Sequence, residues 1–339
     1  MKTNNILFIA LLATVALTQT SCEKVSPQGV LMAGTGVEDR VEMSELYYKQ
    51  YLQNAENDFH VGDNGYSFIV GGDSHVTTDP GRMDEMFAIG LEHNDLMYCH
   101  LGDIADTKAA YYITLDSLIA KAKERYVVKN YELGENGRWF RKDEPGDPIG
   151  FDYNEIRFPF FPVVGNHDLT HNGWGMWSNI FHSSFYEFDV WVGYDEEGYG
   201  IADHFIFLDT ASGTLGKLQV DLIEQGLLDG DAGRTYRNTF VFGHTNIFRP
   251  SSWQFASTFP REETYFLLNQ FEKWNANVVF CGHVHAWEER VYNWVTYLTL
   301  DSMSERNSPK PGDYLVRVNV AKDGAITWER VRMNYVAEK

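Results

Sequence analysis

The segment Tyr66-Ser-Phe-Ile-Val-Gly-Gly-Asp-Ser-His75 places a short apolar run directly before two glycines and two side chains that can bind metals. The run Tyr66–Val70 has the length and the β-branched and aromatic residues of a buried strand. Glycine lets the backbone turn sharply and leaves space beside a bound group. Asp73 and His75 are two residues apart, so in an extended segment both can face one point. The segment therefore predicts a strand that ends at a binding site.

The same pattern recurs four times further along the chain. Each time an apolar run of strand length passes into Gly and then into Asp, Asn or His. The runs and their polar ends are Leu96–Leu101 with Gly102-Asp103, Phe161–Val164 with Gly165-Asn166-His167-Asp168, Thr239–Phe242 with Gly243-His244, and Asn277–Cys281 with Gly282-His283-Val284-His285. In open α/β sheets the loops at the carboxyl ends of strands form the ligand crevice. The five ends are therefore expected to share one site.

The donor types in these motifs indicate which ions would bind. His, Asp and Asn supply nitrogen and oxygen donors, which suit Mn, Fe or Zn better than Ca. The set lacks the thiolates of a structural zinc site, and no cysteine pair has zinc-ribbon spacing. Each motif alone is weak, because a histidine beside a buried strand is more often a core residue. Five motifs in this order predict a metal centre.

The order and spacing resemble the calcineurin-like metallophosphoesterases, from about residue 66 to about residue 287. That family carries Asp-X-His, Gly-Asp-X-X-(Asp/Asn), Gly-Asn-His-(Asp/Glu), Gly-His and Gly-His-X-His. The resemblance implies two transition-metal ions, Mn, Fe or Zn, with Asp103 bridging them. The implied ligands of the first ion are Asp73, His75 and His285, and those of the second are Asn166, His244 and His283.

The resemblance also implies the reaction. A hydroxide bridging the two metals would attack phosphorus in line with the leaving oxygen of a small phosphomonoester or phosphodiester. His167 would contact the phosphate and aid the leaving group, and Asp168 would orient His167. Asp168 could equally cap a turn, and Asp106 could serve only to hydrogen-bond its neighbouring loop. The alternative functions are a lipid-anchored, metal-containing binding protein without turnover and a structural metal protein.

Helical stretches alternate with the apolar runs, which predicts a layered α/β fold. The expected helices are Met83–Glu92, Tyr111–Val127, Leu215–Leu228 and Glu262–Trp274, and further strands are expected at Trp294–Leu300, Tyr314–Val320 and Ala325–Val331. The resemblance implies a four-layer αββα sandwich, with two mixed β-sheets packed face to face and flanking helices. We expect one catalytic domain over residues 61–339, with an insert near 128–160 that is rich in Gly, Pro and charges.

The amino-terminal residues predict export. Residues 1–21 have the charged start and short apolar core of a signal peptide, too short for a transmembrane helix. Cys22 follows small residues as in a bacterial lipobox, although Gln19 stands where that motif usually has Leu. We expect an exported lipoprotein, periplasmic or at the cell surface, held to the membrane by a lipid on Cys22. The alternative is an ordinary cleaved signal with an incidental cysteine. Residues 22–60 are expected to form a tether and an N-terminal helix.

Composition limits the partners. The 339 residues carry a formal net charge of -20. A surface this acidic repels phosphate backbones and makes nucleic acid an unlikely partner. Cys99 and Cys281 are expected to be buried free thiols, with a disulfide between them as the alternative.

Several other side chains follow the ligand motifs and could reach a substrate, although plain packing or surface roles are the alternative for all of them. They are Trp174, Trp177, Arg249, Trp253, Trp287, His171 and His182. Another four histidines have no motif around them and are assigned no role: His60, His93, His100 and His204.

Overall fold

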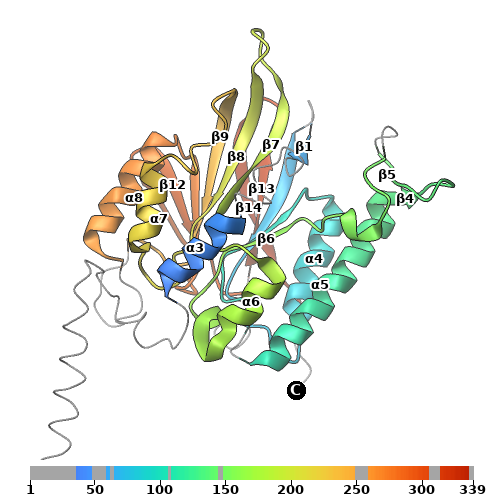
Figure 1. The fold of residues 1–339 in the computed structure, drawn as a ribbon, viewed down its shortest axis with the longest axis horizontal. Coiled ribbons are helices and arrows are strands. Elements are labelled where there is room, and N and C mark those ends of the chain that lie inside the picture. Colours follow the sequence, from blue (N-terminus) through green and yellow to red (C-terminus); the bar gives the residue numbers. More distant parts are fainter. Residues whose placement is uncertain are drawn as a thin grey trace, which may run out of the picture.

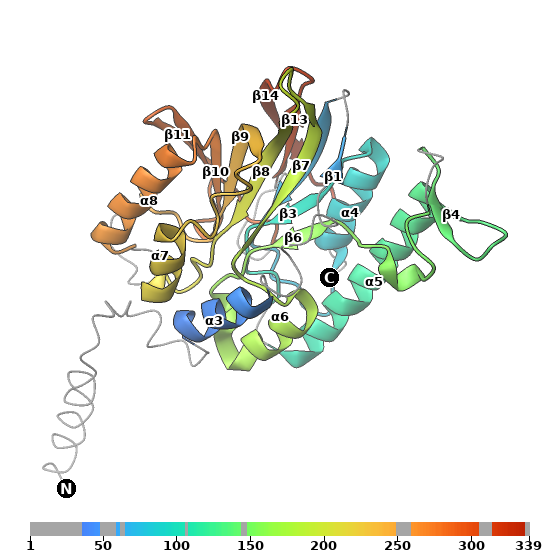
Figure 2. The same cartoon turned by 45° about the horizontal axis from the view of Figure 1, so that its top comes forward.

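The computed structural model describes residues 36–47, 59–61, 65–105, 108–143, 148–248, 259–304 and 314–335. Two large β-sheets stand at the centre of this part of the chain, with helices outside each of them (Figures 1 and 2). The predicted four-layer arrangement of two mixed sheets and flanking helices is confirmed.

One sheet has five strands in the order β14-β13-β2-β3-β6. Its strands are β2 (Tyr66–Gly71), β3 (Tyr98–His100), β6 (Phe160–Pro162), β13 (Tyr314–Val320) and β14 (Ile326–Arg332). β2, β3 and β6 run parallel, whereas β13 is antiparallel to both β2 and β14. The carboxyl ends of β2, β3 and β6 therefore lie at the same edge.

The other sheet has seven strands in the order β1-β7-β8-β9-β10-β12-β11. Its strands are β1 (Phe59–His60), β7 (Tyr186–Tyr194), β8 (Gly200–Phe207), β9 (Arg234–Phe242), β10 (Val278–Cys281), β11 (Glu288–Tyr292) and β12 (Val295–Thr299). The central strands β8, β9, β10 and β12 run parallel. The predicted runs that precede His244 and His283 form neighbouring strands here.

The helices divide into two layers. The outer face of the five-stranded sheet packs against α4 (Gly81–His93), α5 (Ala109–Asn130) and α6 (Gly173–Phe181). The outer face of the seven-stranded sheet packs against α3 (Val37–Tyr47), α7 (Gly216–Glu224) and α8 (Arg261–Lys273). Short 3-10 turns, η3 (Tyr153–Glu155) and η4 (His167–Asn172), lie in connections. No helix in the described ranges has the length and apolar character to cross a bilayer.

A layer of aromatic side chains joins the two sheets. Phe68 from β2 contacts Phe205 and Phe240 edge to face, with ring centroids 5.2 Å away from each. Phe207 and Phe242 stack at 4.5 Å. Aromatic pairs of this kind add stability beyond the area that they bury. This core holds the two sheets, and so their strand ends, in one relative position.

Some elements were not expected from the sequence. They are β1, β4 (Tyr131–Leu133), β5 (Trp139–Arg141), β7, β11 and α6. β11 reads Glu-Glu-Arg-Val-Tyr and is largely exposed at the edge of its sheet, so it has no apolar run to reveal it. β4 and β5 form a hairpin within the predicted insert at 128–160. Cys99 and Cys281 are buried free thiols, as predicted.

Helix α3 packs with α7 and α8 on the seven-stranded sheet, although the sequence places it in the segment outside residues 61–339. Its Arg40 is fully buried and forms a bidentate ion pair with Asp209, with Nε–Oδ2 and Nη2–Oδ1 distances of 2.8 and 2.9 Å. Glu38 accepts the backbone N–H of Leu218 at the start of α7, at 2.9 Å. Of the segment 22–60 that was predicted to form the tether and this helix, residues 22–35 and 48–58 lie outside the described residues.

The buried ion pair makes α3 a measurable contributor to stability. We expect Arg40→Leu to lower the free energy of unfolding by about 3–5 kcal/mol, because Asp209 would remain buried without its counter-charge. Denaturant unfolding would measure this. Replacing both partners by leucine should recover part of the loss, and Lys217→Ala, which removes an exposed ion pair, should change little. An Arg40→Leu protein as stable as the parent would contradict the prediction.

A second buried charge cluster surrounds His204 on β8. Its Nδ1 lies 2.7 Å from Asp189 Oδ1 and its Nε2 lies 2.9 Å from Glu187 Oε2. Asp189 also pairs with Arg234 and accepts the hydroxyl of Tyr236. Burial alone would lower the pKa of His204, but the nearby carboxylates of Asp189 and Glu187 raise it to about 9. His204 is therefore charged at neutral pH.

Stability should consequently fall in mild alkali. The folded pKa lies above the unfolded value of about 6.5, so the stabilisation is fully present below pH 6.5 and is lost as pH rises through about 9. This shift of the His204 pKa corresponds to a change of about 3 kcal/mol in the free energy of unfolding. We expect the stability gap between the parent and His204→Gln to shrink between pH 6.5 and 9.5 in denaturant titrations. A gap that stays constant with pH would refute the assignment.

Candidate metal centre

The five predicted motifs converge at one end of the two sheets. Asp73, Asp103 and Asn166 follow β2, β3 and β6, whereas His244 and His283 follow β9 and β10 of the other sheet. Within the described residues, two groups of side chains bring their donor atoms within 4.8 Å of one another. The first group is Asp73, His75, Asp103 and His285, and the second is Asp103, His244 and His283. Asp103 belongs to both.

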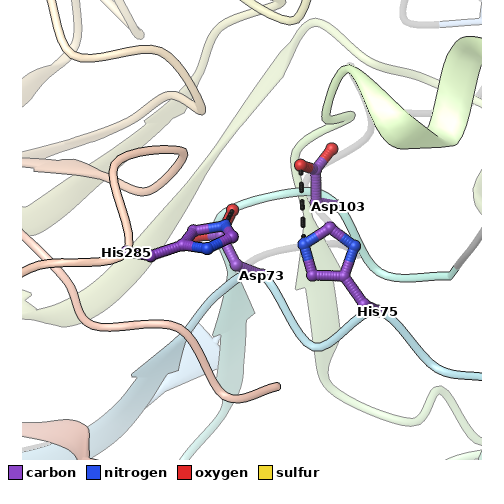
Figure 3. Close-up of side chains that lie close together, drawn as sticks. All are labelled: Asp73, His75, Asp103 and His285. Carbon is purple, nitrogen blue, oxygen red and sulfur yellow. Dashed lines mark hydrogen bonds and ion pairs between the residues drawn. The ribbon is translucent and has the colours of Figure 1, made fainter. Parts of the chain in front are cut away.

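The first group is shown in Figure 3. His285 Nε2 lies 3.1 Å from Asp73 Oδ1, and His75 Nε2 lies 3.9 Å from Asp103 Oδ2. Asp73, His75 and Asp103 are buried, and His285 is half-buried. The side chains come from loops of both sheets and face a common point.

The second group is built around His244. Its Nε2 lies 2.9 Å from Asn166 Oδ1, 3.1 Å from His283 Nδ1 and 3.5 Å from Asp103 Oδ2. Asn166, which the resemblance implies as a ligand, thus lies beside the second group. The structure brings together all seven of the side chains predicted as ligands.

The protonation of His244 tests whether this group suits a cation. Its Nδ1 donates to the carbonyl oxygen of Leu101 at 2.7 Å, so in the neutral ring Nε2 carries the lone pair. That lone pair faces the amide oxygen of Asn166 at 2.9 Å. Two acceptors this close repel unless a positive charge lies between them. A backbone carbonyl that fixes the ring tautomer is the usual support of a metal-binding histidine. The residues therefore fit a metal ion.

The two carboxylates are ionised, as ligands must be. Burial alone would raise the pKa of Asp73, but the hydrogen bond from His285 and the nearby His244 and His75 lower it to about 2. Burial acts on Asp103 in the same direction, yet the histidines around it also lower its pKa below the ordinary value. Two buried anions side by side add to the case for bound cations.

Five of the ligand residues have left-handed backbone conformations, with positive φ. The angles are 52° for Asp73, 44° for His75, 52° for Asp103, 67° for His283 and 56° for His285. Such conformations cost about 1–3 kcal/mol each outside glycine and concentrate at functional sites. The loops therefore store strain in order to point these side chains inward.

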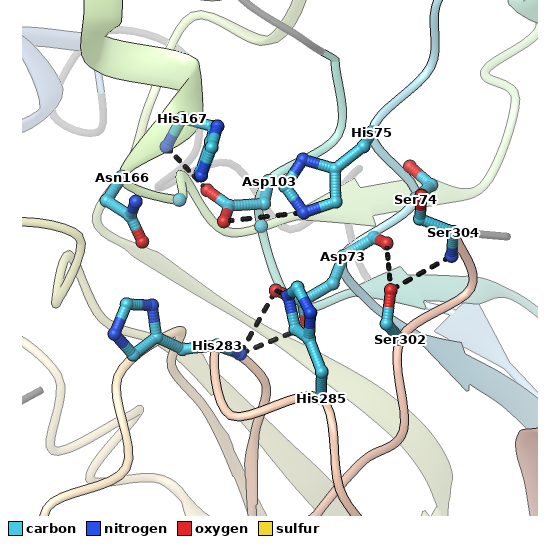
Figure 4. A network of polar contacts seen from close by, with 12 residues as sticks. Asp73, Ser74, His75, Asp103, Asn166, His167, His283, His285, Ser302 and Ser304 are labelled. Atoms are coloured by element: carbon cyan, nitrogen blue, oxygen red, sulfur yellow. Dashed lines mark hydrogen bonds and ion pairs between the residues drawn. The ribbon is translucent and has the colours of Figure 1, made fainter. Parts of the chain in front are cut away.

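Hydrogen bonds between loops hold this strained backbone. The N–H of Asp73 donates to Gly102 O and the N–H of His75 donates to Asp103 O, both at 3.0 Å. Ser302 Oγ donates to Asp73 O at 2.8 Å (Figure 4). On the other side, Thr210 Oγ1 accepts the backbone N–H of His244 at 2.7 Å. Neither Ser302 nor Thr210 was predicted as a support from the sequence.

His167 lies beside both groups. Its backbone N–H donates to Asp103 Oδ1 at 2.6 Å, and its ring meets that of His75 edge to face at 4.6 Å. The side chain is half-buried and lies next to Asp103 in Figure 4. This placement fits a group that contacts a substrate at the metals.

Asp168 was predicted to orient His167 or to cap a turn, and in the structure its side chain bonds to the backbone of two motif loops. Its fully buried carboxylate accepts the backbone N–H groups of Gly165 at 2.8 Å, Ile104 at 3.0 Å and Ala105 at 3.2 Å. The hydroxyl of Tyr112 adds a further donor at 3.3 Å. A carboxylate has about four acceptor positions, and these donors occupy them. Burial and the Asp103 charge raise the pKa of Asp168 to about 7. Asp168 thus joins the second and third motif loops.

Some of the side chains that were predicted as possible substrate contacts lie in the described residues, where they pack against other side chains or lie at the surface. Trp174 and Trp177 are buried in the core and stack at 5.3 Å. Trp287 lies under the guanidinium of Arg330 at 4.9 Å. His171 and His182 are exposed. Arg249, Trp253 and Asp106 lie outside the described residues.

Comparisons with known proteins give matches in structure only. No family model matches the sequence, and no curated protein matches it. Among solved structures, the chain is similar to GAP50, the anchor in the inner membrane complex of Plasmodium, at 14% identity and a TM-score of 0.47, covering 80% of this chain and 90% of that one. It is also similar to a dimetal phosphatase from Danio rerio, at 9% identity and a TM-score of 0.42, covering 80% and 100%.

A third similar structure is a novel archaeal phosphodiesterase, at 9% identity and a TM-score of 0.34, covering 78% of this chain and 99% of that one. At these identities and scores the likenesses concern the fold.

Proposed function

We propose that the chain is a metal-dependent hydrolase of phosphate esters that uses two transition-metal ions, Mn, Fe or Zn. The observation that carries the proposal is the shared position of Asp103, whose carboxylate lies in both donor groups. A single carboxylate between two sets of nitrogen and oxygen donors is the arrangement of a two-metal hydrolytic site. The nitrogen-rich donor set supports transition metals rather than calcium.

The roles of the residues follow from their contacts. Asp73, His75 and His285 would hold one ion, Asn166, His244 and His283 the other, and Asp103 both. Bound ions of this kind lower the pKa of water and stabilise negative charge on phosphoryl oxygens. The His244 Nδ1–H bond to Leu101 O keeps Nε2 free of a proton at the site.

His167 would act as the general acid of the reaction. Its ring lies against that of His75, and its backbone is fixed by Asp103. From there the imidazole N–H can donate to a phosphate oxygen or to the leaving oxygen, which is the task of a general acid. The substrate class that we propose is a small phosphomonoester or phosphodiester, because a net charge of -20 disfavours long polyanions.

Metal-dependent hydrolysis is the first test of this function. We expect the mature protein with Mn, Zn or Fe to cleave para-nitrophenyl phosphate, its bis ester or the phenylphosphonate, and chelation to abolish the activity. Asp103→Asn should remove nearly all turnover, because the shared carboxylate is lost. His167→Ala should lower kcat by about 10²–10⁴-fold, the usual contribution of a general acid, with metal content unchanged. Steady-state kinetics and metal analysis measure both effects.

The exposed His182 provides a matched control, since His182→Ala removes an imidazole close in sequence to the site without touching the ligands. Its kinetics should equal those of the parent. If the protein binds two metals per chain and cleaves none of the three esters, the function is refuted in favour of a metal-containing binding protein without turnover.

We also propose export with a lipid on Cys22, on the strength of the signal-like residues 1–21. In a bacterial host, radioactive palmitate should label the full-length chain, and Cys22→Ser should lose the label and shift the protein out of the detergent phase. Equal labelling of both forms would refute the anchor.

A further inference from the structure

His100 is a fully buried histidine at the end of β3, three residues before the shared ligand Asp103. No sequence motif includes it, and its side chain belongs to neither donor group. Burying a polar ring costs free energy unless its nitrogens are hydrogen-bonded. The partners of those two nitrogens therefore show what the residue does.

The hydrogen bonds of His100 define one tautomer. The backbone N–H of Gly102 donates to Nδ1 at 3.2 Å, so Nδ1 carries the lone pair. The proton then lies on Nε2, which donates to Ser74 Oγ at 3.0 Å. Ser74 Oγ in turn donates a hydrogen bond to Ile104 O at 2.8 Å. Burial lowers the pKa of His100 to about 3, which agrees with a neutral ring.

Each partner of this hydrogen-bonded chain adjoins a ligand. Ser74 stands between Asp73 and His75, while Gly102 and Ile104 stand on either side of Asp103. The three ligands have positive φ angles of 52°, 44° and 52°. A strained backbone persists only where its surroundings hold it in place. The His100 ring is one such support, because its hydrogen bonds join the first motif loop to the second.

The second donor group has separate supports. His244 is oriented by Leu101 O at its Nδ1 and by Thr210 Oγ1 at its backbone N–H. Its other neighbours, Asn166 and His283, come from loops that no hydrogen bond of the His100 ring reaches. The two groups share Asp103 and are joined by the backbone N–H of His283, which donates to Asp73 Oδ2 at 3.0 Å, but the His100 ring forms no hydrogen bond to His244, Asn166 or His283.

We propose that His100 is a positioning residue for the first metal, acting through Ser74 to set Asp73 and His75 against Asp103. The inference rests on the proposed two-metal function. It predicts an asymmetry, since loss of the His100 hydrogen bonds should weaken the metal held by Asp73, His75 and His285 much more than the other.

Metal titration of the folded protein tests this asymmetry without measuring turnover. Calorimetry and manganese electron paramagnetic resonance would follow the two binding steps, and Asp73→Asn would identify the step that belongs to the first group. We expect His100→Phe to weaken that step about 10–100-fold, the usual effect of losing a partner behind a ligand, and to leave the other within about twofold. Phenylalanine keeps the ring and its packing near Phe160.

Three further variants separate positioning from packing. His100→Gln places an amide donor near Ser74 Oγ and should restore most of the affinity. Ser74→Ala should reproduce the loss, and adding His100→Phe to it should cause little further change, because both act through one hydrogen bond. Thr210→Val is the mirror control, since it removes the support of His244 and should weaken the other step. Thermal unfolding in chelator would check that each variant is folded.

The outcomes distinguish this inference from the function on which it rests. If the parent binds fewer than two metals, the proposed function fails. If the parent binds two and His100→Phe binds both equally well, or loses both equally, the positioning role of His100 is overturned while the two-metal function stands. Should His100→Phe fail to fold, Ser74→Ala and His100→Gln decide the question by the same criterion.

Discussion

The burial of two carboxylates among histidines is the constraint on which the rest of the structure depends. Asp73 and Asp103 are almost completely excluded from water, yet the surrounding imidazoles hold both in the charged form. Charges in such a setting need partners, because desolvation costs several kcal/mol for each ion. Histidines supply part of the compensation and bound cations would supply the remainder. The strand ends, the strained loops and their hydrogen bonds all act to maintain this arrangement.

The sheets provide the rigidity that such a cluster requires. Parallel strands end at the same edge, so β2, β3 and β6 present three ligand loops, and β9 and β10 present two more. The aromatic core, with Phe68 between Phe205 and Phe240, holds the two sheets in position. Neither sheet alone contains a complete donor group, since each group takes ligands from both. Packing between the sheets is therefore a condition for the site, and not only for stability.

The ligands could be predicted from sequence because all seven lie shortly after one of five strands, where an apolar run and a glycine signal their place. The supports could not, since they depend on contacts between distant segments. Thr210 reaches His244 across 34 residues, and Arg40 reaches Asp209 across 169. The contacts of Asp168 could not be predicted for the same reason. Its donors include Ile104 and Ala105 from another loop, which no local pattern reveals.

These supports also hold the loop of Asp103 from several sides. His167 donates to its carboxylate, Asp168 binds the two residues that follow it, and His100 accepts from the residue before it. His285, by contrast, is half-buried and extends from the loop before the exposed strand β11. A shared ligand must satisfy two ions at once, so its position tolerates the least error. The hydrogen bonds around Asp103 therefore act where the site tolerates the least error.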